Sequence, residues 1–268
     1  MPVVLLPATM RRLTTLLLFL LLIPSSLLAN DQNIVIASGE WPPWTGRELP
    51  HNGFINHIVK EAFAREGRTV RFEFYPWPRT NQLVKYGEVD ASSYWYNNEN
   101  RHEYVFFSDI VSIEDTVFFH LKGKNMPPWK ELSDLKRHRI GVVNGITYED
   151  ELMELSKKGI LQLYQSNTEK ENFNKLIRNR VDIFPAPRRM GQSILETQFS
   201  PEERNVIDYS PQKLASYEGY IVFPMNKPNS EALRDAFNAG LRKIKEDGTY
   251  DKLMHDMDEG RYSAPTRQ

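Results

Sequence analysis

The sequence predicts an α/β protein of two similar lobes, each a mixed sheet flanked by helices. A strand–helix–strand–helix–strand order occurs twice in tandem along the chain, which is the pattern of two α/β units. Both repeats enter their third strand through a helix, a basic residue and a Val-Asp pair, at Val89-Asp90 and at Val181-Asp182. A further strand and two helices follow the second repeat and depart from its order.

The first repeat shows the periodicities of both element types. Apolar residues keep helical spacing from Gly53, and Gly67 ends that helix. Apolar and polar residues then alternate strictly over 70–74, which predicts a strand. The paired prolines in Trp41-Pro42-Pro43-Trp44 require a loop, because proline cannot donate to a strand ladder. The expected strands are 33–37, 70–74 and 89–91, and a short helix over 81–86 precedes the third of them.

The second repeat and the tail follow the same rules. The expected strands of the repeat are 140–143, 161–164 and 181–184, and its expected helices are 148–157 and 169–180. In the tail we expect a strand over 219–223 and a helix that Ser230 caps. Its apolar face carries Leu233, Phe237, Leu241 and Ile244. A last short helix follows a turn at 247–250.

The amino terminus has the layout of a secretory signal peptide. Arg11-Arg12 precede an apolar run over 16–23, Pro24 breaks it, and Ala29 offers a small residue for cleavage. The run is shorter than the about 20 residues that a membrane span needs. We therefore expect residues 1–29 to be removed, with no stable membrane insertion, although Met10 is an alternative start. An exported chain without cysteine cannot carry a lipid anchor, so we expect a soluble periplasmic protein.

Composition excludes several function classes. The 268 residues carry a formal net charge of -1, so no nucleic-acid footprint is visible. The six histidines lack metal-ligand spacing, and thiol catalysis is excluded because cysteine is absent. We expect no cofactor, no metal and a monomer. Catalysis by carboxylates stays open, since any Asp or Glu can serve once the chain is folded.

One stretch points to a ligand. Gly87-Glu88-Val89-Asp90-Ala91-Ser92 leads a helix end into a buried strand, Glu99-Asn100-Arg101 follows, and Phe106-Phe107-Ser108-Asp109 forms a return strand and turn. Open α/β sheets bind ligands beyond the carboxyl ends of their strands. Arg101 stands at such a place, where an anionic ligand would be met.

This order resembles the polar amino-acid-type solute-binding proteins of family 3, whose pattern is G-x-V/I-D-A, T-x-E-R and F-S-x-P. Asn98 replaces the threonine. The resemblance covers nearly all of the mature chain and implies a periplasmic-binding-protein fold with a ligand cleft between two lobes. The implied first lobe is 30–121 with 211–268, and the second lobe is 122–210. The chain would cross between them near 119–123 and 209–214.

The resemblance also implies site residues. Arg101 would fork onto a ligand carboxylate, because its planar donors match that group bidentately. Ser92 and Ser93 would assist, and Thr147 would add the amides of a helix amino terminus. Each residue also has a plain structural interpretation, as a surface arginine, as small residues in a tight turn, or as an ordinary helix cap.

Aromatic and charged residues near strand exits are further candidates. Trp41 and Trp95 would stack on a ligand and exclude water from the cleft. For Trp44 and Trp77, a cleft role and packing of the loop on its own lobe have equal support. Glu40 and Arg79 would contact the two ends of a zwitterion or pair with each other, and the ion pair has at least equal support.

The main departure from the family pattern lies at Pro185-Ala186-Pro187-Arg188-Arg189. The family places an aspartate for the ligand ammonium where Pro187 stands, and arginines follow here. Either Glu40 or Glu218 supplies the acid, or the ligand lacks that ammonium, because an unpaired charge is costly to desolvate. We favour the second. Arg188 would face the cleft or be solvated at a helix start.

The expected function is periplasmic binding of a small polar solute that carries a carboxylate. Hinge closure would present the bound form to the permease subunits of an ABC importer. Two alternatives remain open: an enzyme on the same fold, of the cyclohexadienyl dehydratase type, and a sensory protein that hands its ligand state to a membrane receptor.

Overall fold

The structure is a computed structural model that describes residues 33–263, except for 98, 125, 127 and 145–147. The described strands form one nine-stranded sheet in the order β2-β1-β3-β9-β5-β8-β6-β7, and β4 also pairs with β9. The strands are β1 (Ile34–Ser38), β2 (Val70–Phe74), β3 (Ala91–Tyr96), β4 (Val105–Phe107), β5 (Ser112–Leu121), β6 (Arg139–Val143), β7 (Gln162–Ser166), β8 (Ile183–Pro187) and β9 (Ile207–Pro224).

The helices divide into two groups with the strands they cover. The α-helices are α2 (Phe54–Arg65), α3 (Trp77–Lys85), α4 (Asp150–Lys157), α5 (Glu169–Ile177), α6 (Arg188–Gln198), α7 (Pro201–Asn205), α8 (Ser230–Glu246) and α9 (Thr249–Asp258). The 3₁₀ helices are η2 (Pro50–Asn52), η3 (Glu99–Arg101) and η4 (Leu132–Arg137). We call β1 to β4 with α2, α3, α8 and α9 the β1 group, and β6 to β8 with α4 to α7 the β6 group.

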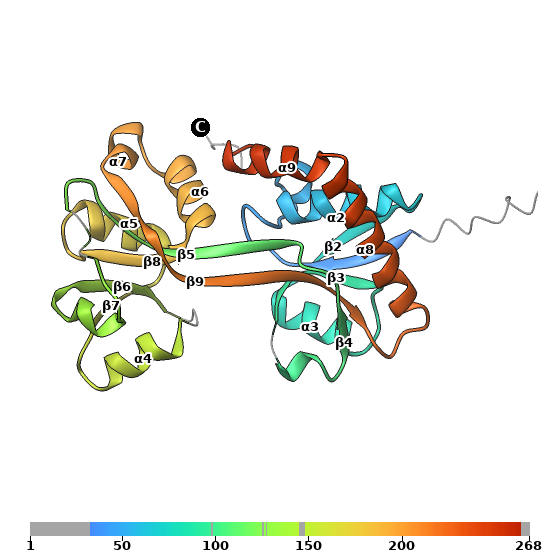
Figure 1. The fold of residues 1–268 in the computed structure, drawn as a ribbon, viewed down its shortest axis with the longest axis horizontal. Coiled ribbons are helices and arrows are strands. Elements are labelled where there is room, and N and C mark those ends of the chain that lie inside the picture. Colours follow the sequence, from blue (N-terminus) through green and yellow to red (C-terminus); the bar gives the residue numbers. More distant parts are fainter. Residues whose placement is uncertain (1–32, 98, 125, 127, 145–147, 264–268) are drawn as a thin grey trace, which may run out of the picture. The chain divides into compact units, whose positions relative to one another are not determined.

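Two long antiparallel strands connect the groups. β5 and β9 pair along their lengths, from Ser112 opposite Gly219 to Leu121 opposite Ile207. β9 also pairs with β3 and β4, whereas β5 pairs with β8. Figure 1 shows these two strands running from one group to the other.

The pairing bears on where the lobes divide. β5 already pairs with β8 at Thr116, which is also opposite Ala215 of β9. The crossings expected near 119–123 and 209–214 therefore lie beyond the start of that pairing. The division at 121/122 and 210/211 remains a proposal, and boundaries near Asp115 and Ser216 fit the pairing better.

The tail packs on the β1 group. A Cβ at Gly240 of α8 would lie 1.9 Å from the carbonyl oxygen of Ala62 in α2, so the two helix backbones approach closely there. The rings of Phe63 and Phe237 lie 5.4 Å apart beside this contact, and both side chains are fully buried. Such close packing is what a small residue in a helix–helix contact permits.

Two elements of the first repeat are longer than the sequence predicted. The third strand runs through Tyr96, because β1 and β9 both supply it with hydrogen-bonding partners. The helix that precedes this strand was also predicted too short: α3 begins at Trp77, with Pro78 in its first turn, a position that suits proline. Trp95 thus lies in a strand and Trp77 in a helix, not in loops.

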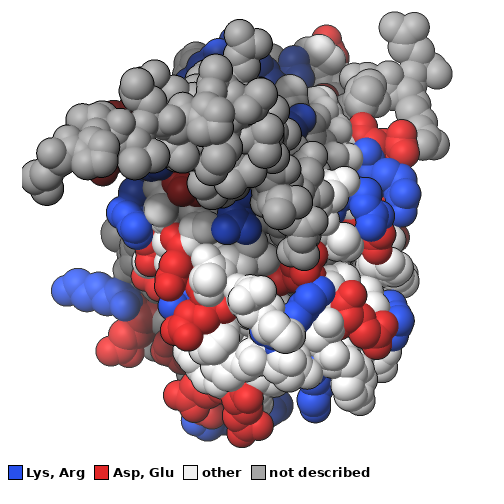
Figure 2. Space-filling model, turned by 90° about the vertical axis from the view of Figure 1, so that its right-hand side faces the viewer, with Lys and Arg blue, Asp and Glu red and all other residues white. Residues whose placement is uncertain are grey.

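The surface of the β1 group carries both signs of charge. On the face in Figure 2, Lys and Arg side chains are interspersed with Asp and Glu among the described atoms. Within the described ranges, no helix has the length and apolar character to cross a membrane.

His57 is held at a junction of η2, α2 and the segment after α9. Its ring stacks on His51 with the centroids 3.9 Å apart, and its Nδ1 hydrogen-bonds with the hydroxyl of Tyr262 at 2.8 Å. Burial first, and then the neighbouring His51, lowers the pKa of His57 to about 4. The neutral imidazole is therefore the form that the folded chain favours.

We expect this histidine to make stability depend on pH. Between the ordinary histidine pKa of about 6.5 and about 4, the unfolded chain binds a proton that the folded chain does not. The free energy of unfolding should fall as pH falls through this window, by about 1.4 kcal/mol per pH unit from this group. Urea unfolding at several pH values measures it. His57→Asn, which keeps a polar atom near Nδ1, should flatten the profile, and an unchanged profile would contradict the assignment.

Candidate functional site

A large cavity lies where the two groups face each other across β5 and β9. Its volume is about 810 Å³, within the range of small-molecule sites. The β1 group contributes Trp41, Trp77, Trp95 and Arg101, and the β6 group contributes Tyr148, Glu149, Glu169 and Pro187. Tyr217 of β9 and Thr116 of β5 complete its floor. A solute here would contact both groups at once.

Aromatic side chains form most of the β1-group wall. The Trp41 ring packs edge-on against Trp77 at 6.4 Å, and Trp77 packs edge-on against Trp95 at 6.0 Å. These are favourable geometries for aromatic pairs. Trp41 and Trp95 line the cavity as the sequence suggested, and so does Trp77. Trp44 is fully buried and is not part of the lining.

Arg101 ends η3, just beyond β3, and its guanidinium faces the cavity. The guanidinium carbon lies 4.6 Å from the centre of the Trp95 ring, and Nη1 donates to the carbonyl oxygen of Tyr96 at 2.7 Å. These two contacts hold the side chain in place. Among the described residues, the carbonyl of Tyr96 is the hydrogen-bond acceptor that the structure gives the Arg101 guanidinium. The other donors of the guanidinium therefore remain for a ligand.

Glu149 lines the opposite wall, and the sequence did not single it out. Its Oε1 accepts a hydrogen bond from the hydroxyl of Tyr217 at 2.8 Å. Its Oε2 is buried and has no hydrogen-bond partner in the described part of the chain. Burial, and then this bond, raises the pKa of Tyr217, so that the hydroxyl stays a donor.

A continuous contact path connects the two charged walls. The ring of Tyr217 stacks on that of Tyr96 with centroids 5.2 Å apart, and the carbonyl of Tyr96 holds Arg101. Tyr217 in turn holds Glu149. The cation and the carboxylate are therefore positioned by adjacent tyrosines of β3 and β9, with Glu169 of α5 as a second acid in the lining.

Ser92 and Ser93 lie inside β3 and are fully buried, and neither lines the cavity. Ser92 accepts a hydrogen bond from Nε1 of Trp95 at 2.7 Å, which fixes that ring. Ser93 donates to the side-chain oxygen of Asn56 at 2.5 Å. Both side chains are used within the fold, and Ser92 positions one of the aromatic rings of the cavity wall.

Three charged candidates, Glu40, Arg79 and Arg188, are not part of the cavity lining. Glu40 is exposed and accepts from the backbone N–H of Arg47. Arg79 forms an ion pair with Glu88 at 3.0 Å, and Arg188 lies over the ring of Tyr209 at 5.9 Å. The predicted pair of Glu40 with Arg79 is thus replaced by other partners. Thr147 falls in 145–147, which the structure does not describe.

Glu218 was the other acid considered for an ammonium. It is exposed on β9, where the hydroxyl of Tyr220 donates to it. Alternation along the strand turns it away from its neighbour Tyr217, which faces the cavity. It is not part of the cavity lining.

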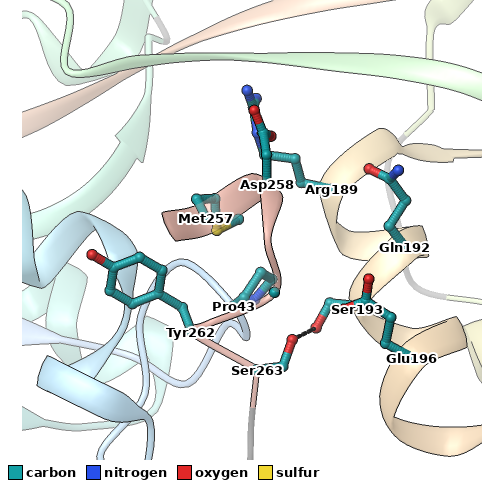
Figure 3. Close-up of a pocket in the computed structure, with 10 residues that line it drawn as sticks. Pro43, Arg189, Gln192, Ser193, Glu196, Met257, Asp258, Tyr262 and Ser263 are labelled. Carbon is teal, nitrogen blue, oxygen red and sulfur yellow. Dashed lines mark hydrogen bonds and ion pairs between the residues drawn. The ribbon is translucent and has the colours of Figure 1, made fainter. Parts of the chain in front are cut away.

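A second, much smaller cavity lies between α6 and the end of α9 (Figure 3). Its volume is about 10 Å³, which is room for about one water molecule. Arg189 of α6 reaches Asp258 at 3.1 Å and Glu114 of β5 at 3.7 Å, and Ser193 hydrogen-bonds with Ser263 at 3.1 Å. This site is a structural contact between α6 and α9 and is too small for a solute.

The sequence matches the family "Bacterial extracellular solute-binding proteins, family 3" over residues 34–256. The match spans most of the chain. The chain belongs to this family. None of the curated proteins compared with it matches the sequence.

Solved structures share the fold of this family 3 chain. An ancestral arginine-binding protein bound to arginine has a TM-score of 0.61 at 20% identity, covering 84% of this chain and 97% of that one. Substrate binding domain 2 of Lactococcus lactis GlnP, in an open conformation, has 0.66 at 14%, covering 87% and 95%. A histidine kinase sensor domain similar to periplasmic binding proteins has 0.60 at 18%, covering 85% and 96%. The family 3 chain thus has the two-lobed periplasmic-binding-protein fold.

Proposed function

We propose that this family 3 protein binds a small polar solute through a carboxylate, in the cavity between the β1 and β6 groups. The observation that carries the proposal is the Arg101 guanidinium, held against Trp95 and Tyr96 with donors left for a ligand. The wall around it is largely aromatic, and surroundings of low polarity strengthen a charge-assisted bond. Trp41 and Trp95 would close the site around the solute.

We further propose that binding drives hinge closure. The solute would contact Arg101 from the β1 group and Glu149 from the β6 group, and β5 and β9 connect those groups. Contacts made to both groups favour the closed arrangement, because only there can the ligand form all of them. The closed form would be read by the permease subunits of an ABC importer. Family membership and the fold shared with a GlnP substrate-binding domain support that delivery role.

We also propose where in the cell the protein acts. Residues 1–29 would direct export to the periplasm and be cleaved, so that the mature chain begins near Asn30. Amino-terminal sequencing of the exported protein tests this. An uncleaved terminus in the membrane fraction would contradict it.

A thermal-shift screen tests the binding function. Amino acids, dicarboxylates, polyamines and opines would be compared, because a ligand that binds the folded state raises the melting temperature by mass action. We expect the stabilising compounds to carry a carboxylate and the polyamines to be inactive. Stabilisation by polyamines alone would show that the arginine does not select the solute.

A further inference from the structure

The unpaired carboxylate oxygen of Glu149 is the feature of the cavity that the proposed function leaves unexplained. A buried carboxylate oxygen without a donor is costly, because it has lost water and gained nothing in return. Glu149 precedes α4 at its N-cap position, yet its side chain makes no capping hydrogen bond. Its side chain is therefore not used to cap the helix.

The charges of the lining leave a place for a cation. Among the described residues that line the cavity, Arg101 is the one Lys or Arg side chain, and Glu149 and Glu169 are the acids. A solute carboxylate on Arg101 would leave both acids without a cationic partner. Tyr96 and Tyr217 also line the cavity, and the open face of an aromatic ring attracts positive charge.

None of the other acids considered from the sequence is placed to bind a cationic group of the solute. Pro187 lines the cavity at the position where the family pattern has its aspartate, and Glu40 and Glu218 are not in the lining. Glu149 comes from a different element, the start of α4, and it is held by Tyr217 from β9. The cavity therefore has a carboxylate that comes from the start of α4 and not from the position where the family has its aspartate.

We propose that Glu149, oriented by Tyr217, binds a cationic nitrogen of the solute. This inference rests on the proposed function and narrows its ligand to a molecule with both a carboxylate and a cationic nitrogen. Arg101 takes the first group and Glu149 the second. The sequence alone favoured a ligand that lacks the ammonium. The inference replaces it with a ligand that carries a cationic nitrogen.

Matched pairs of small acids test the inference. In each pair a methyl or tert-butyl group replaces the cationic nitrogen at nearly constant shape. The pairs are γ-aminobutyrate with pentanoate, glycine betaine with tert-butylacetate, and L-leucine with its analogue in which methyl replaces the ammonium. Melting temperatures and then calorimetric titrations are measured for all six. We expect at least one zwitterion to bind, and its isostere to bind at least about tenfold more weakly, because the isostere lacks the attraction between the cationic nitrogen and Glu149.

Two variants locate the effect. Glu149→Gln keeps the size and the acceptor for Tyr217 and should reduce the difference within the pair to less than about threefold. Glu151→Gln, an exposed acid in the first turn of the same helix, is the matched control and should keep the difference. Should Glu149→Gln fold poorly, Tyr217→Phe keeps the carboxylate but removes its orienting hydroxyl, and it should reduce the difference in part.

The outcomes separate the two proposals. Binding of zwitterion and isostere with equal affinity, both lost in Arg101→Ala, overturns the role of Glu149 and leaves the proposed function standing. A difference that persists unchanged in Glu149→Gln and in Tyr217→Phe overturns it too. Failure of all three zwitterions to bind the wild-type protein overturns the inferred ligand class. Zwitterion binding that survives Arg101→Ala contradicts the proposed function instead.

Discussion

Arg101→Ala is expected to abolish micromolar binding of the solute while the chain stays folded. Removing one partner of a desolvated charge pair costs about 2–5 kcal/mol of binding, much of it because the other charge is left unpaired. Here the loss would fall on the solute carboxylate, which would meet aromatic walls and the acids of the lining. Calorimetric titration of the tightest ligand from the screen measures the change in Kd.

A second arginine provides the control. Arg234 of α8 lies over the ring of Phe106 at 5.2 Å, much as Arg101 lies over Trp95, but it is on the surface beside Glu231 and Asp235. Arg234→Ala should bind normally. Arg101→Lys keeps the charge but loses the planar fork, so its affinity should fall between those of the wild type and Arg101→Ala. Unchanged affinity in Arg101→Ala would remove this residue from the site.

Arg189→Met should lower the free energy of unfolding by about 3–5 kcal/mol, because it leaves a buried charge without its partner. Glu114 is 1% exposed, and its carboxylate lies 3.7 Å from the Arg189 guanidinium. Burial raises the pKa of Glu114, and Arg189 opposes that effect. Without the arginine the effect of burial is less opposed, so the folded chain holds the proton on Glu114 to higher pH than the unfolded chain does.

Two comparisons isolate this cause. The loss in the free energy of unfolding caused by Arg189→Met should be smaller at pH values below the ordinary glutamate pKa. There Glu114 is protonated in both the folded and the unfolded states. Adding Glu114→Gln to Arg189→Met should restore part of the stability, since the buried charge is then gone. Denaturant unfolding measures both, and a loss below about 1 kcal/mol in Arg189→Met would contradict the account.

Local order in the sequence pointed to Arg101, Trp41 and Trp95, and the structure places these three side chains in the lining of one cavity. A strand, its carboxyl end and the residue just beyond it can be recognised within a single stretch of chain. The same stretch placed Ser92 and Ser93 at the exit of the strand, whereas both lie inside β3. β3 continues to Tyr96 because β9 pairs with it, and that partner lies far along the chain. A strand's end depends on its neighbours, which no local pattern shows.

Glu149 could not be found from the sequence for a related reason. An acid at a helix start is usually a cap or a favourable charge at the helix dipole. Its direction here is set by the hydroxyl of Tyr217, which lies 68 residues further along the chain. Similarly, the lengths of β5 and β9 follow from their pairing with each other and with β3 and β8.

The most direct test of the central claim uses the five tryptophans of the chain as reporters. Trp41, Trp77 and Trp95 line the cavity, whereas Trp129 packs against Phe118 in the core of the β6 group. Fluorotryptophan labelling with fluorine NMR, assigned by single Trp→Phe variants, follows each site during titration with the tightest ligand. The account predicts that saturation shifts the three cavity resonances and leaves that of Trp129 in place. Saturation that moves Trp129 and leaves all three cavity resonances unchanged would contradict it.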